Sequence, residues 1–221
     1  MRTLLTLNIG GILSALLLGV VLLYLGWLSG EDLAFFLVMV YFLMLSTLVT
    51  RTGQEKKERM GVYERGRGWK NVFANGIVPV IVAALFLASV YQGHADPRFV
   101  VAYVASIAAI TADKFASEIG ILDGQPTMLL TAKPARKGDS GGVTALGTTA
   151  SLLGAFLIST CILALNLPVM YIVVAAAAGF LGNLVDSLFG YFEERGIGNK
   201  YTSNMACAVT GAVIAFVVLF L

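Results

Sequence analysis

The chain has 221 residues, of which 58% are hydrophobic and 13% are charged, and its formal net charge is +2. A soluble domain carries roughly 25% charged residues, so this composition excludes an ordinary soluble protein and indicates one embedded in a membrane. The apolar runs are continuous and do not alternate, which favours membrane-spanning helices over a transmembrane β-barrel.

A helix needs about 20 apolar residues to span a hydrocarbon core. Seven segments approach that length: residues 4–28, 32–50, 72–91, 98–117, 142–166, 168–190 and 204–221. The first runs too long, and too directly into the second, to be a secretory signal peptide. We therefore predict an all-α fold, a polytopic membrane helical bundle of about seven transmembrane helices, and a single domain over residues 1–221.

Lysine and arginine gather in the loops on one side of the predicted bundle. Alternating spans place the N-terminus and the loops 51–71, 118–141 and 191–203 on that side. It holds Arg2, Arg51, Lys56, Lys57, Arg59, Arg65, Arg67, Lys70, Lys133, Arg136, Lys137, Arg195 and Lys200, with Lys114 at its border. Only Arg98 lies on the other side. By the positive-inside rule, we predict that the N-terminus and this face are cytoplasmic, in a protein of the cell membrane.

The first long loop on this face, 51–71, combines two kinds of polar residue. The charges interpreted as only orienting the protein and contacting anionic lipid are Lys56, Lys57 and Arg59. Arg67, Asn71 and Asn75 recur every four residues toward the third span, so one helix face can point them at a shared pocket.

The fourth span ends in a polar stretch, ITADKFASEIG, at residues 110–120. On a helix, Asp113 and Ser117 share one face, and Lys114 and Glu118 share the next. A carboxylate cannot reach far toward the membrane surface, and charged residues at such depth normally point into the bundle and mark a site. We predict functional roles for Asp113 and Glu118, whereas Lys114 either takes part or is a snorkelling partner of Glu118.

A glycine-rich segment, ARKGDSGG, precedes the fifth span. Backbone N–H groups in such a turn before a helix N-terminus form an anion nest, which nearby Arg and Lys side chains strengthen. The residues expected to bind phosphate are Arg136, Lys137, Gly138, Ser140, Gly141 and Gly142. The segment is not a Walker A loop, because it lacks the G-x-x-x-x-G-K-[ST] pattern.

The sixth span carries small and polar residues at helical spacing. Close helix packing accounts for the glycines, which are Gly179, Gly182 and Gly190. It does not account for Asp186, with Ser187 beside it and Asn183 one turn before. We predict that Asp186 is a second carboxylate, aimed at the same pocket as Asp113.

Carboxylates, a glycine nest and basic side chains together predict Mg²⁺ and phosphates. Mg²⁺ usually binds one or two carboxylates plus phosphate oxygens and water. We expect Asp113, Glu118 and Asp186 to be the catalytic and metal-ligating residues. Phosphoryl transfer depends mainly on positioning and charge neutralisation, and a phosphate acceptor is already anionic. A site without histidine suits this chemistry, and the one histidine, His94, is expected to be an outer-loop residue without a catalytic role.

Four segments in order resemble a family of integral-membrane proteins, long described as a domain of unknown function, that includes the CTP-dependent phytyl-phosphate kinase of vitamin E biosynthesis. They are RGRGWKNVFANG, DKFASEIG, KGDSGGVTALGT and GNLVDSLFG, and the resemblance covers most of residues 65–212. The matching positions are Asp113, Ser117, Glu118, Gly120, Gly141, Gly142, Thr144, Gly147, Thr148, Gly182, Asp186 and Ser187. The family usually has Thr where this chain has Lys114, and of its N-[ND]-x-V-N run only Asn204 is kept.

The resemblance implies transfer of the γ-phosphate of CTP to a prenyl monophosphate of phytyl or geranylgeranyl type, giving a prenyl diphosphate and CDP. The prenyl tail would lie between helices, with its phosphate at the inner interface. Side chains expected to bind nucleotide or lipid, besides the loop residues above, are Arg67, Asn75, Ser117, Thr144, Asn183, Ser187 and Asn204. The expected cofactor is Mg²⁺, with CTP as phosphate donor; the expected partners are a prenyl-phosphate lipid, nucleotide and membrane lipids, with no nucleic acid.

Three other functions remain open at this stage. A cytidylyltransferase or a prenol kinase would use the same CTP and Mg²⁺ set and would differ in its products. A transporter would place its binding residues near the membrane midplane, often with inverted repeats. The polar residues here crowd one face, which favours an enzyme.

Overall fold

The computed structural model describes residues 6–64 and 66–221, so Arg2 and Arg65 of the predicted charge pattern lie outside the described residues. The long helices are α1 (Ile9–Ser29), α2 (Ala34–Arg51), α4 (Trp69–Tyr91), α5 (Pro97–Gly120), α6 (Ala145–Ser159), which α7 (Cys161–Ala164) continues, α8 (Met170–Glu193) and α9 (Lys200–Val218). Within the described residues these give seven segments long and apolar enough to cross a membrane. The predicted all-α membrane bundle is confirmed.

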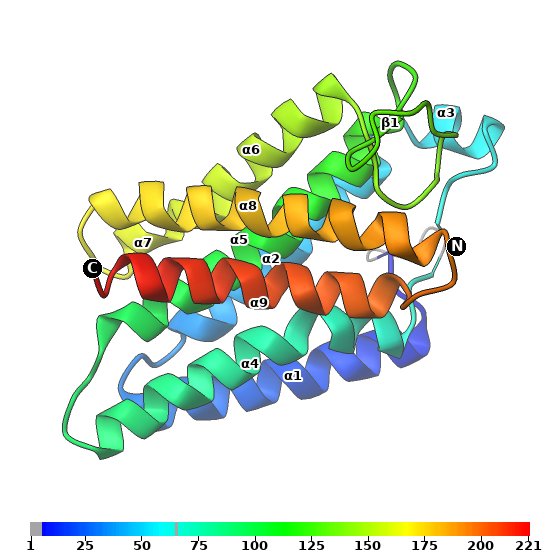
Figure 1. Cartoon of the computed structure of the whole chain (residues 1–221). Helices are drawn as coiled ribbons and strands as arrows, with labels where there is room; N and C mark the ends of the chain where they lie inside the picture. The colour runs from blue at the N-terminus through cyan, green and yellow to red at the C-terminus, as the bar shows by residue number, and fades with distance from the viewer. Residues whose placement is uncertain (1–5, 65) are drawn as a thin grey trace.

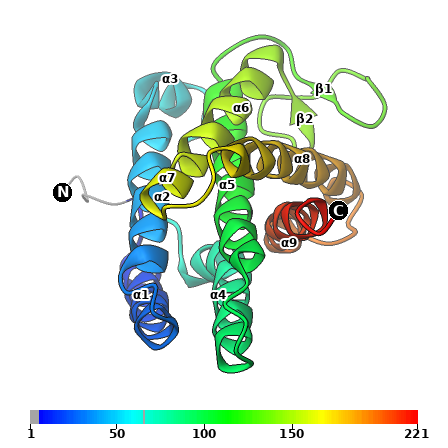
Figure 2. The same ribbon diagram turned by 90° about the vertical axis from the view of Figure 1, so that its left-hand side faces the viewer.

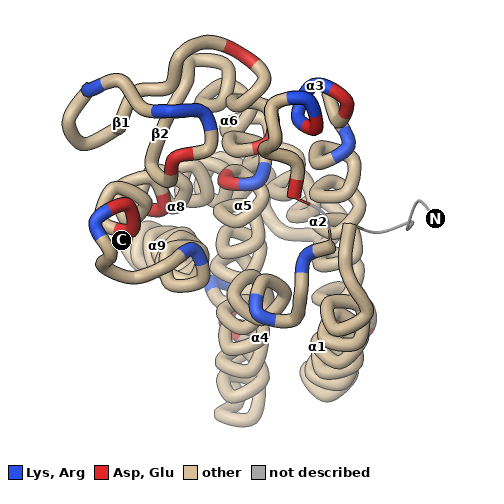
Figure 3. The backbone as a smooth tube through the Cα atoms, turned by 90° about the vertical axis from the view of Figure 1, so that its right-hand side faces the viewer, with Lys and Arg blue, Asp and Glu red and all other residues tan. Residues whose placement is uncertain are grey.

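Successive long helices run in opposite directions, so most of the charged loops lie at one end of the bundle (Figure 1). This end holds the short helix α3 (Gln54–Arg59) and a hairpin of β1 (Thr127–Met128) and β2 (Gly142–Val143), whose register pairs Thr127 with Val143. Figure 3, which colours the backbone by residue type, shows Lys, Arg, Asp and Glu residues gathered around these elements and the start of α9. We call it the charged end.

Helix α5 is the centre of the bundle (Figure 2). Every residue from 100 to 112 is buried, because α5 packs against α2, α4, α6, α8 and α9. The run FVVAYVASIAAI is rich in alanine, and such small residues let neighbouring helices approach α5 closely. The polar residues that follow this run therefore begin inside the protein.

Glycines let α8 and α9 approach the backbone of α5. A Cβ at Gly182 would lie 2.7 Å from the Cβ of Ala109, and one at Gly179 would lie 2.7 Å from that of Ala108. Helices α5 and α8 both run toward the charged end, so Asp113 and Asp186 follow one turn after the contact between Ala109 and Gly182. The packing predicted for these glycines is confirmed, and it brings the two carboxylates together.

Two helix boundaries differ from the predicted ones. Helix α8 continues to Glu193, three residues beyond the predicted end at 190, and α9 begins at Lys200 instead of 204. A capping box starts α9. The Asn199 side chain accepts a hydrogen bond from the Thr202 N–H, and the Thr202 hydroxyl oxygen accepts one from the Asn199 N–H. The polar residues at the end of α8 and the start of α9 are too hydrophilic to be counted in a membrane span by hydropathy. They are nevertheless helical, because their backbone groups are hydrogen-bonded.

Candidate active site

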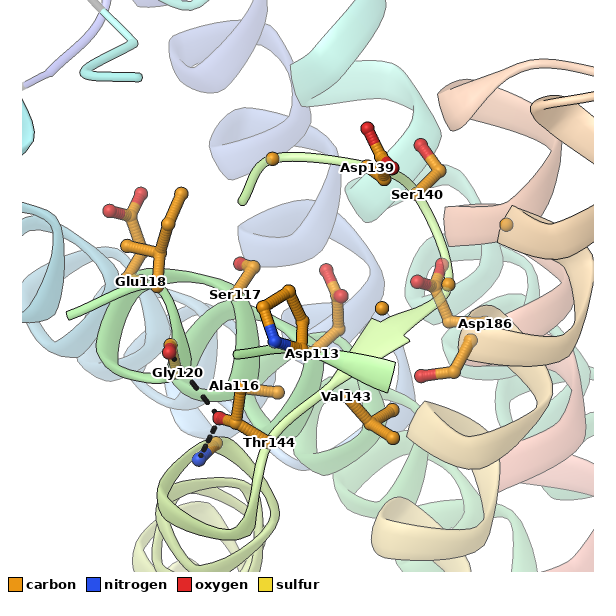
Figure 4. A pocket seen from close by; sticks show the side chains of 18 of the residues that line it. Asp113, Ala116, Ser117, Glu118, Gly120, Asp139, Ser140, Val143, Thr144 and Asp186 are labelled. Atoms are coloured by element: carbon orange, nitrogen blue, oxygen red, sulfur yellow. Dashed lines mark hydrogen bonds between the residues drawn. The ribbon is translucent and has the colours of Figure 1, made fainter. Parts of the chain in front are cut away.

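A polar cavity of about 330 Å³ opens at the charged end, among α5, α8, the start of α9 and the loop before α6 (Figure 4). We call it the polar cavity. The predicted site residues that line it are Asp113, Ser117, Glu118, Arg136, Lys137, Gly138, Ser140, Gly141, Gly142, Thr144, Asn183, Asp186, Ser187 and Asn204. Arg67 and Asn75 line a second cavity instead. The tertiary structure thus brings together nearly all the residues that the sequence singled out.

Asp113 of α5 and Asp186 of α8 both line the polar cavity, and their carboxyl groups are neighbours (Figure 4). Asp186 also lies near Glu193, which is two turns later on the same face of α8. One carboxylate oxygen of Asp186 and one of Glu193 are buried without a hydrogen-bond partner among the described residues. Unsatisfied buried carboxylate oxygens are costly, and a bound cation is one of the few groups that satisfies them.

The donor set fits Mg²⁺ only in part. Within residues 6–64 and 66–221, no three His, Cys, Asp or Glu side chains converge as a metal-binding group. The predicted set of three carboxylates is therefore not assembled, but the pair of Asp113 and Asp186 is. Two carboxylates completed by phosphate oxygens and water are an ordinary set for Mg²⁺. The residues present thus fit the ion when a phosphate substrate accompanies it.

Glu118 does not join this pair, contrary to the predicted metal-ligating role. Its Oε2 accepts from Lys57 Nζ at 2.7 Å, and its Oε1 accepts from the Arg67 guanidinium and, at 3.0 Å, from the Thr50 hydroxyl. Five helical residues separate Glu118 from Asp113, which turns their side chains about 140° apart. Figure 4 shows Glu118 directed away from Asp186.

The ion pair continues as a row of alternating charges. Arg67 Nε donates to Glu64 at 3.1 Å, and Lys200 Nζ donates to the other Glu64 oxygen at 2.9 Å. We call Lys57, Glu118, Arg67, Glu64 and Lys200 the charge ladder. It joins α3, α5, the 60–68 loop and α9 beside the polar cavity.

The interpretation of Lys57 as a lipid-contacting charge is wrong. Its side chain is 1% exposed, because α3 lies over the end of α2, and Lys57 Nζ donates to the carbonyls of Val49 and Thr50 as well as to Glu118. Unpaired carbonyls at a helix C-terminus attract a cation, so Lys57 also caps α2.

The charge ladder makes stability depend on pH through Glu64. Partial burial by itself raises the pKa of Glu64, but the charge and hydrogen bond of Lys200, with smaller contributions from Lys114 and Arg67, outweigh it and lower the pKa to about 2. A lowered pKa stabilises the fold above the ordinary value of 4.5, and this stabilisation is lost as the pH falls from 4.5 toward 2. Glu64 is half-exposed, so solvent reduces the effect.

We predict that Glu64→Gln lowers the thermal unfolding midpoint at pH 7 and that its difference from the wild type shrinks toward pH 3. Unfolding of the purified proteins in detergent, followed over this range, measures the difference. Asp123→Asn, at an exposed residue just beyond the end of α5, is the control for a change of one carboxylate at the same end of the bundle. A difference for Glu64→Gln that is independent of pH contradicts the prediction.

Backbone N–H groups of the loop before α6 donate hydrogen bonds to carboxylates, and both carboxylates are side chains of the protein itself. The Arg136 N–H donates to Asp139 Oδ2, and the Ser140 N–H donates to Glu194 Oε1, both at 2.8 Å. Gly138 and Gly141 have φ of 99° and 79°, which favour glycine, and Gly141 lies against the backbone of α8. The side chains of Arg136 and Lys137 are exposed at the cavity mouth. These N–H groups donate to two different carboxylates, and phosphate binding by the loop stays a prediction.

Thr144 lines the polar cavity, yet its hydroxyl is used by the fold. The hydroxyl oxygen accepts from the Gly147 N–H at 3.0 Å as the N-cap of α6, and the hydroxyl donates to the Gly120 carbonyl at 3.3 Å (Figure 4). It therefore ties the start of α6 to the end of α5.

We predict that Thr144→Ala lowers stability by about 1 kcal/mol, because a helix start loses its cap. Thr144→Ser should restore the loss, and Thr149→Ala, which removes an exposed hydroxyl from the same helix, should have a smaller effect. Thermal unfolding in detergent compares the three. A large drop in activity with unchanged stability would instead support the ligand-binding role expected from the sequence.

The amides predicted on one face of the third span form a chain. Asn204 Nδ2 donates to Asn75 Oδ1 at 3.0 Å, and Asn75 Nδ2 donates to Asn71 Oδ1 at 3.2 Å. Asn204 lines the polar cavity, whereas Asn71 and Asn75 line the second one. The chain therefore connects α9 with α4 between the two cavities.

Several residues of the site were not predicted as such: Lys57, Glu64, Glu193, Lys200 and Ser203. A signal for Glu193 was present in the sequence, since it follows Asp186 by seven residues, a spacing that puts both on one helix face. The other four depend on how α3, the 60–68 loop and the start of α9 fold over the bundle end. No spacing in the sequence reports that arrangement.

Comparison with known proteins gives a consistent picture. The family described as "Integral membrane protein DUF92" matches residues 2–218. An uncharacterized membrane protein of Methanocaldococcus jannaschii is 34% identical over 94% of this chain and 84% of its own length. Two proteins of Arabidopsis thaliana also match. Protein PGR is 32% identical over 70% of this chain, and Protein VTE6, chloroplastic, is 29% identical over 90%.

The matched part is 62% of Protein PGR and 60% of Protein VTE6, so this chain spans about three fifths of those two relatives. No solved structure matches the chain. The family match and the Arabidopsis relatives confirm the family indicated by the four sequence segments.

Proposed function

We propose a function from the premise that this chain belongs to the DUF92 family of integral membrane proteins, which its match over residues 2–218 shows. The protein is proposed to be a CTP-dependent prenyl-phosphate kinase at the cytoplasmic face of the cell membrane. The observation that carries the proposal is the polar cavity, where a half-buried carboxylate pair lies beside a glycine loop with two basic side chains at the end of a membrane bundle.

The proposed reaction suits the groups in this cavity. An oxygen of the prenyl monophosphate attacks the γ-phosphorus of CTP, and the bond from that phosphorus to the β–γ bridging oxygen breaks. CDP leaves with the electron pair, and the lipid becomes a diphosphate. The attacking oxygen is already anionic, so the lining residues need to supply no strong base.

The basic and the acidic residues of the cavity have different proposed roles. Arg136 and Lys137, at the mouth, would bind the nucleotide phosphates. Asp113 and Asp186 would hold Mg²⁺, which when bound neutralises the negative charge on the phosphates. Ser117 and Ser187 line the same walls and supply hydroxyl groups next to the two carboxylates.

The depth of the carboxylate pair also supports a lipid acceptor. Asp113 lies seven residues before the end of α5, which is roughly 10 Å along the helix axis. A phosphate at that depth is reached by a lipid whose tail remains among apolar helices. A water-soluble acceptor gains nothing from a site inside a membrane bundle.

An assay with γ-labelled CTP, Mg²⁺, purified protein and phytyl or geranylgeranyl phosphate tests the proposal. We expect labelled prenyl diphosphate and an equal amount of CDP. Failure to form a diphosphate from any prenyl phosphate would refute it.

The products also identify the other candidates. Release of pyrophosphate indicates a cytidylyltransferase, and phosphorylation of a free prenol indicates a prenol kinase. Uptake of lipid phosphate into liposomes without turnover of CTP indicates a transporter.

A further inference from the structure

A second cavity, of about 100 Å³, lies between α1, α2 and α4. Its walls are mostly apolar and include Leu18, Phe36, Met39, Leu43 and Val72. We call it the apolar cleft. The outer faces of α1 and α2 carry exposed leucines along their length, as expected for helices in contact with lipid.

The inner end of the apolar cleft is basic. Arg67 and Lys114 line it together with the amides of Asn71 and Asn75, and none of the described residues that line it is an Asp or Glu. Lys114 lines the polar cavity as well, so this side chain lies where the two cavities adjoin. The side chain of the neighbouring Asp113 is turned about 100° away on the helix, toward Asp186.

Lys114 is held less tightly than the other cations around it. It is 8% exposed, so it does not reach the surface as a snorkelling side chain does. Its ammonium lies 3.7 Å from Glu118 Oε1, beyond hydrogen-bond distance, and that oxygen already accepts from Arg67 and Thr50. A buried ammonium is stabilised by an anion in contact with it.

We propose that the apolar cleft holds the head-proximal part of the tail of a lipid monophosphate and that Lys114 contacts its phosphate; this rests on the proposed function. The lipid then lies with its tail between α1, α2 and α4. Its phosphate is placed at the junction of the cavities, on the side of α5 next to Asp113. Nucleotide enters from the charged end, so donor and acceptor approach the carboxylate pair from different cavities.

Charge complementarity selects this occupant. An apolar helix from another protein would fill the cleft but leave Lys114 without an anion at hydrogen-bond distance, whereas Arg67 already contacts Glu118 and Glu64. A neutral lipid has the same defect. An anionic head group on an apolar tail satisfies both the walls and the inner end.

Photocrosslinking tests the inference by binding alone. The probe is a geranylgeranyl monophosphate with a diazirine on the first isoprene unit, irradiated with the full-length protein in detergent without CTP. We expect labelled peptides from α1, α2 and α4. Lys114→Met should weaken probe binding about tenfold or more, because a charge-assisted contact is lost, while the thermal midpoint is retained.

Matched variants separate the possible outcomes. Lys133→Met removes a lysine that lines neither cavity, and we expect unchanged labelling. Val72→Phe fills the cleft and should reduce labelling, whereas Leu153→Phe, on the exposed face of α6, should not. Labelling mainly on α6 or α8, or equal labelling by Lys114→Met, overturns the inference. A second probe, the corresponding prenol without the phosphate, should label the protein less; labelling equal to that of the monophosphate probe also overturns the inference.

The same data distinguish this inference from the proposed function. Expected labelling without CTP turnover would refute the kinase reaction and leave the lipid-phosphate site. Turnover with labelling outside α1, α2 and α4 would refute only the lipid site.

Discussion

Replacing Asp186 by Asn is expected to lower the turnover of CTP with prenyl phosphate by roughly a thousandfold, the range found when a preorganised electrostatic group is removed from an active site. Asn keeps the shape of Asp but not its charge. The change removes half of the carboxylate pair that would hold Mg²⁺. We also expect the Mg²⁺ concentration for half-maximal activity to rise at least tenfold, as a magnesium titration of the purified variant will measure.

The same substitution should leave stability unchanged or raise it. Asp186 is half-buried beside Asp113 and Glu193, and one of its oxygens is buried without a hydrogen-bond partner among the described residues. Like charges held together in a protein interior destabilise the fold and are retained at functional sites. Loss of activity together with a higher thermal midpoint therefore identifies a functional carboxylate.

Asp123→Asn is the matched control for this experiment. Asp123 is exposed just beyond the end of α5 and lines neither cavity. We expect it to retain both activity and magnesium dependence. Full activity in Asp186→Asn, or a variant that loses activity only because it unfolds, contradicts the proposed role.

Glu118→Gln is expected to give the largest loss of stability. Glu118 lies between the buried cations Lys57 and Arg67, whose side chains are 1% and 6% exposed. Removing one partner of a buried ion pair leaves charges without compensation and costs about 3–5 kcal/mol. Thermal unfolding in detergent, with and without Mg²⁺, measures the loss.

Two comparisons make the test specific. Glu55→Gln removes the exposed partner of Arg59 and should change the midpoint little. In the double variant Glu118→Gln/Lys57→Met, the second change removes one of the uncompensated charges, so part of the stability should return. The alternative is the metal-ligating role predicted from the sequence. It predicts a stable Glu118→Gln variant that has lost its response to Mg²⁺.

The contrast between Asp186 and Glu118 shows what a sequence pattern can and cannot resolve. Both are carboxylates near the ends of apolar spans, and both match the family segments. Hydropathy and spacing report that such a residue is too deep to be solvated. They do not report which neighbour satisfies it, because that depends on which helix faces meet.

Two features of the sequence were sufficient for the fold. The apolar runs determine seven helices, since transfer into lipid depends on each segment's own composition. The small residues Gly179 and Gly182 determine that α8 approaches α5 closely. The two aspartates stand one turn later on each helix, so their pairing followed from the sequence as well.

The tertiary structure alone decided how the charges are used. Lys57 and Lys200 belong to polar turns that hydropathy assigns to loops, yet folding places them in the charge ladder with Glu118 and Glu64. It also divides the site into two cavities that adjoin at Lys114. The physical reason is that these two properties depend on different distances along the chain. Burial in a membrane is a local property that the sequence carries residue by residue, whereas an ion pair depends on a distance between segments that only the packed bundle defines.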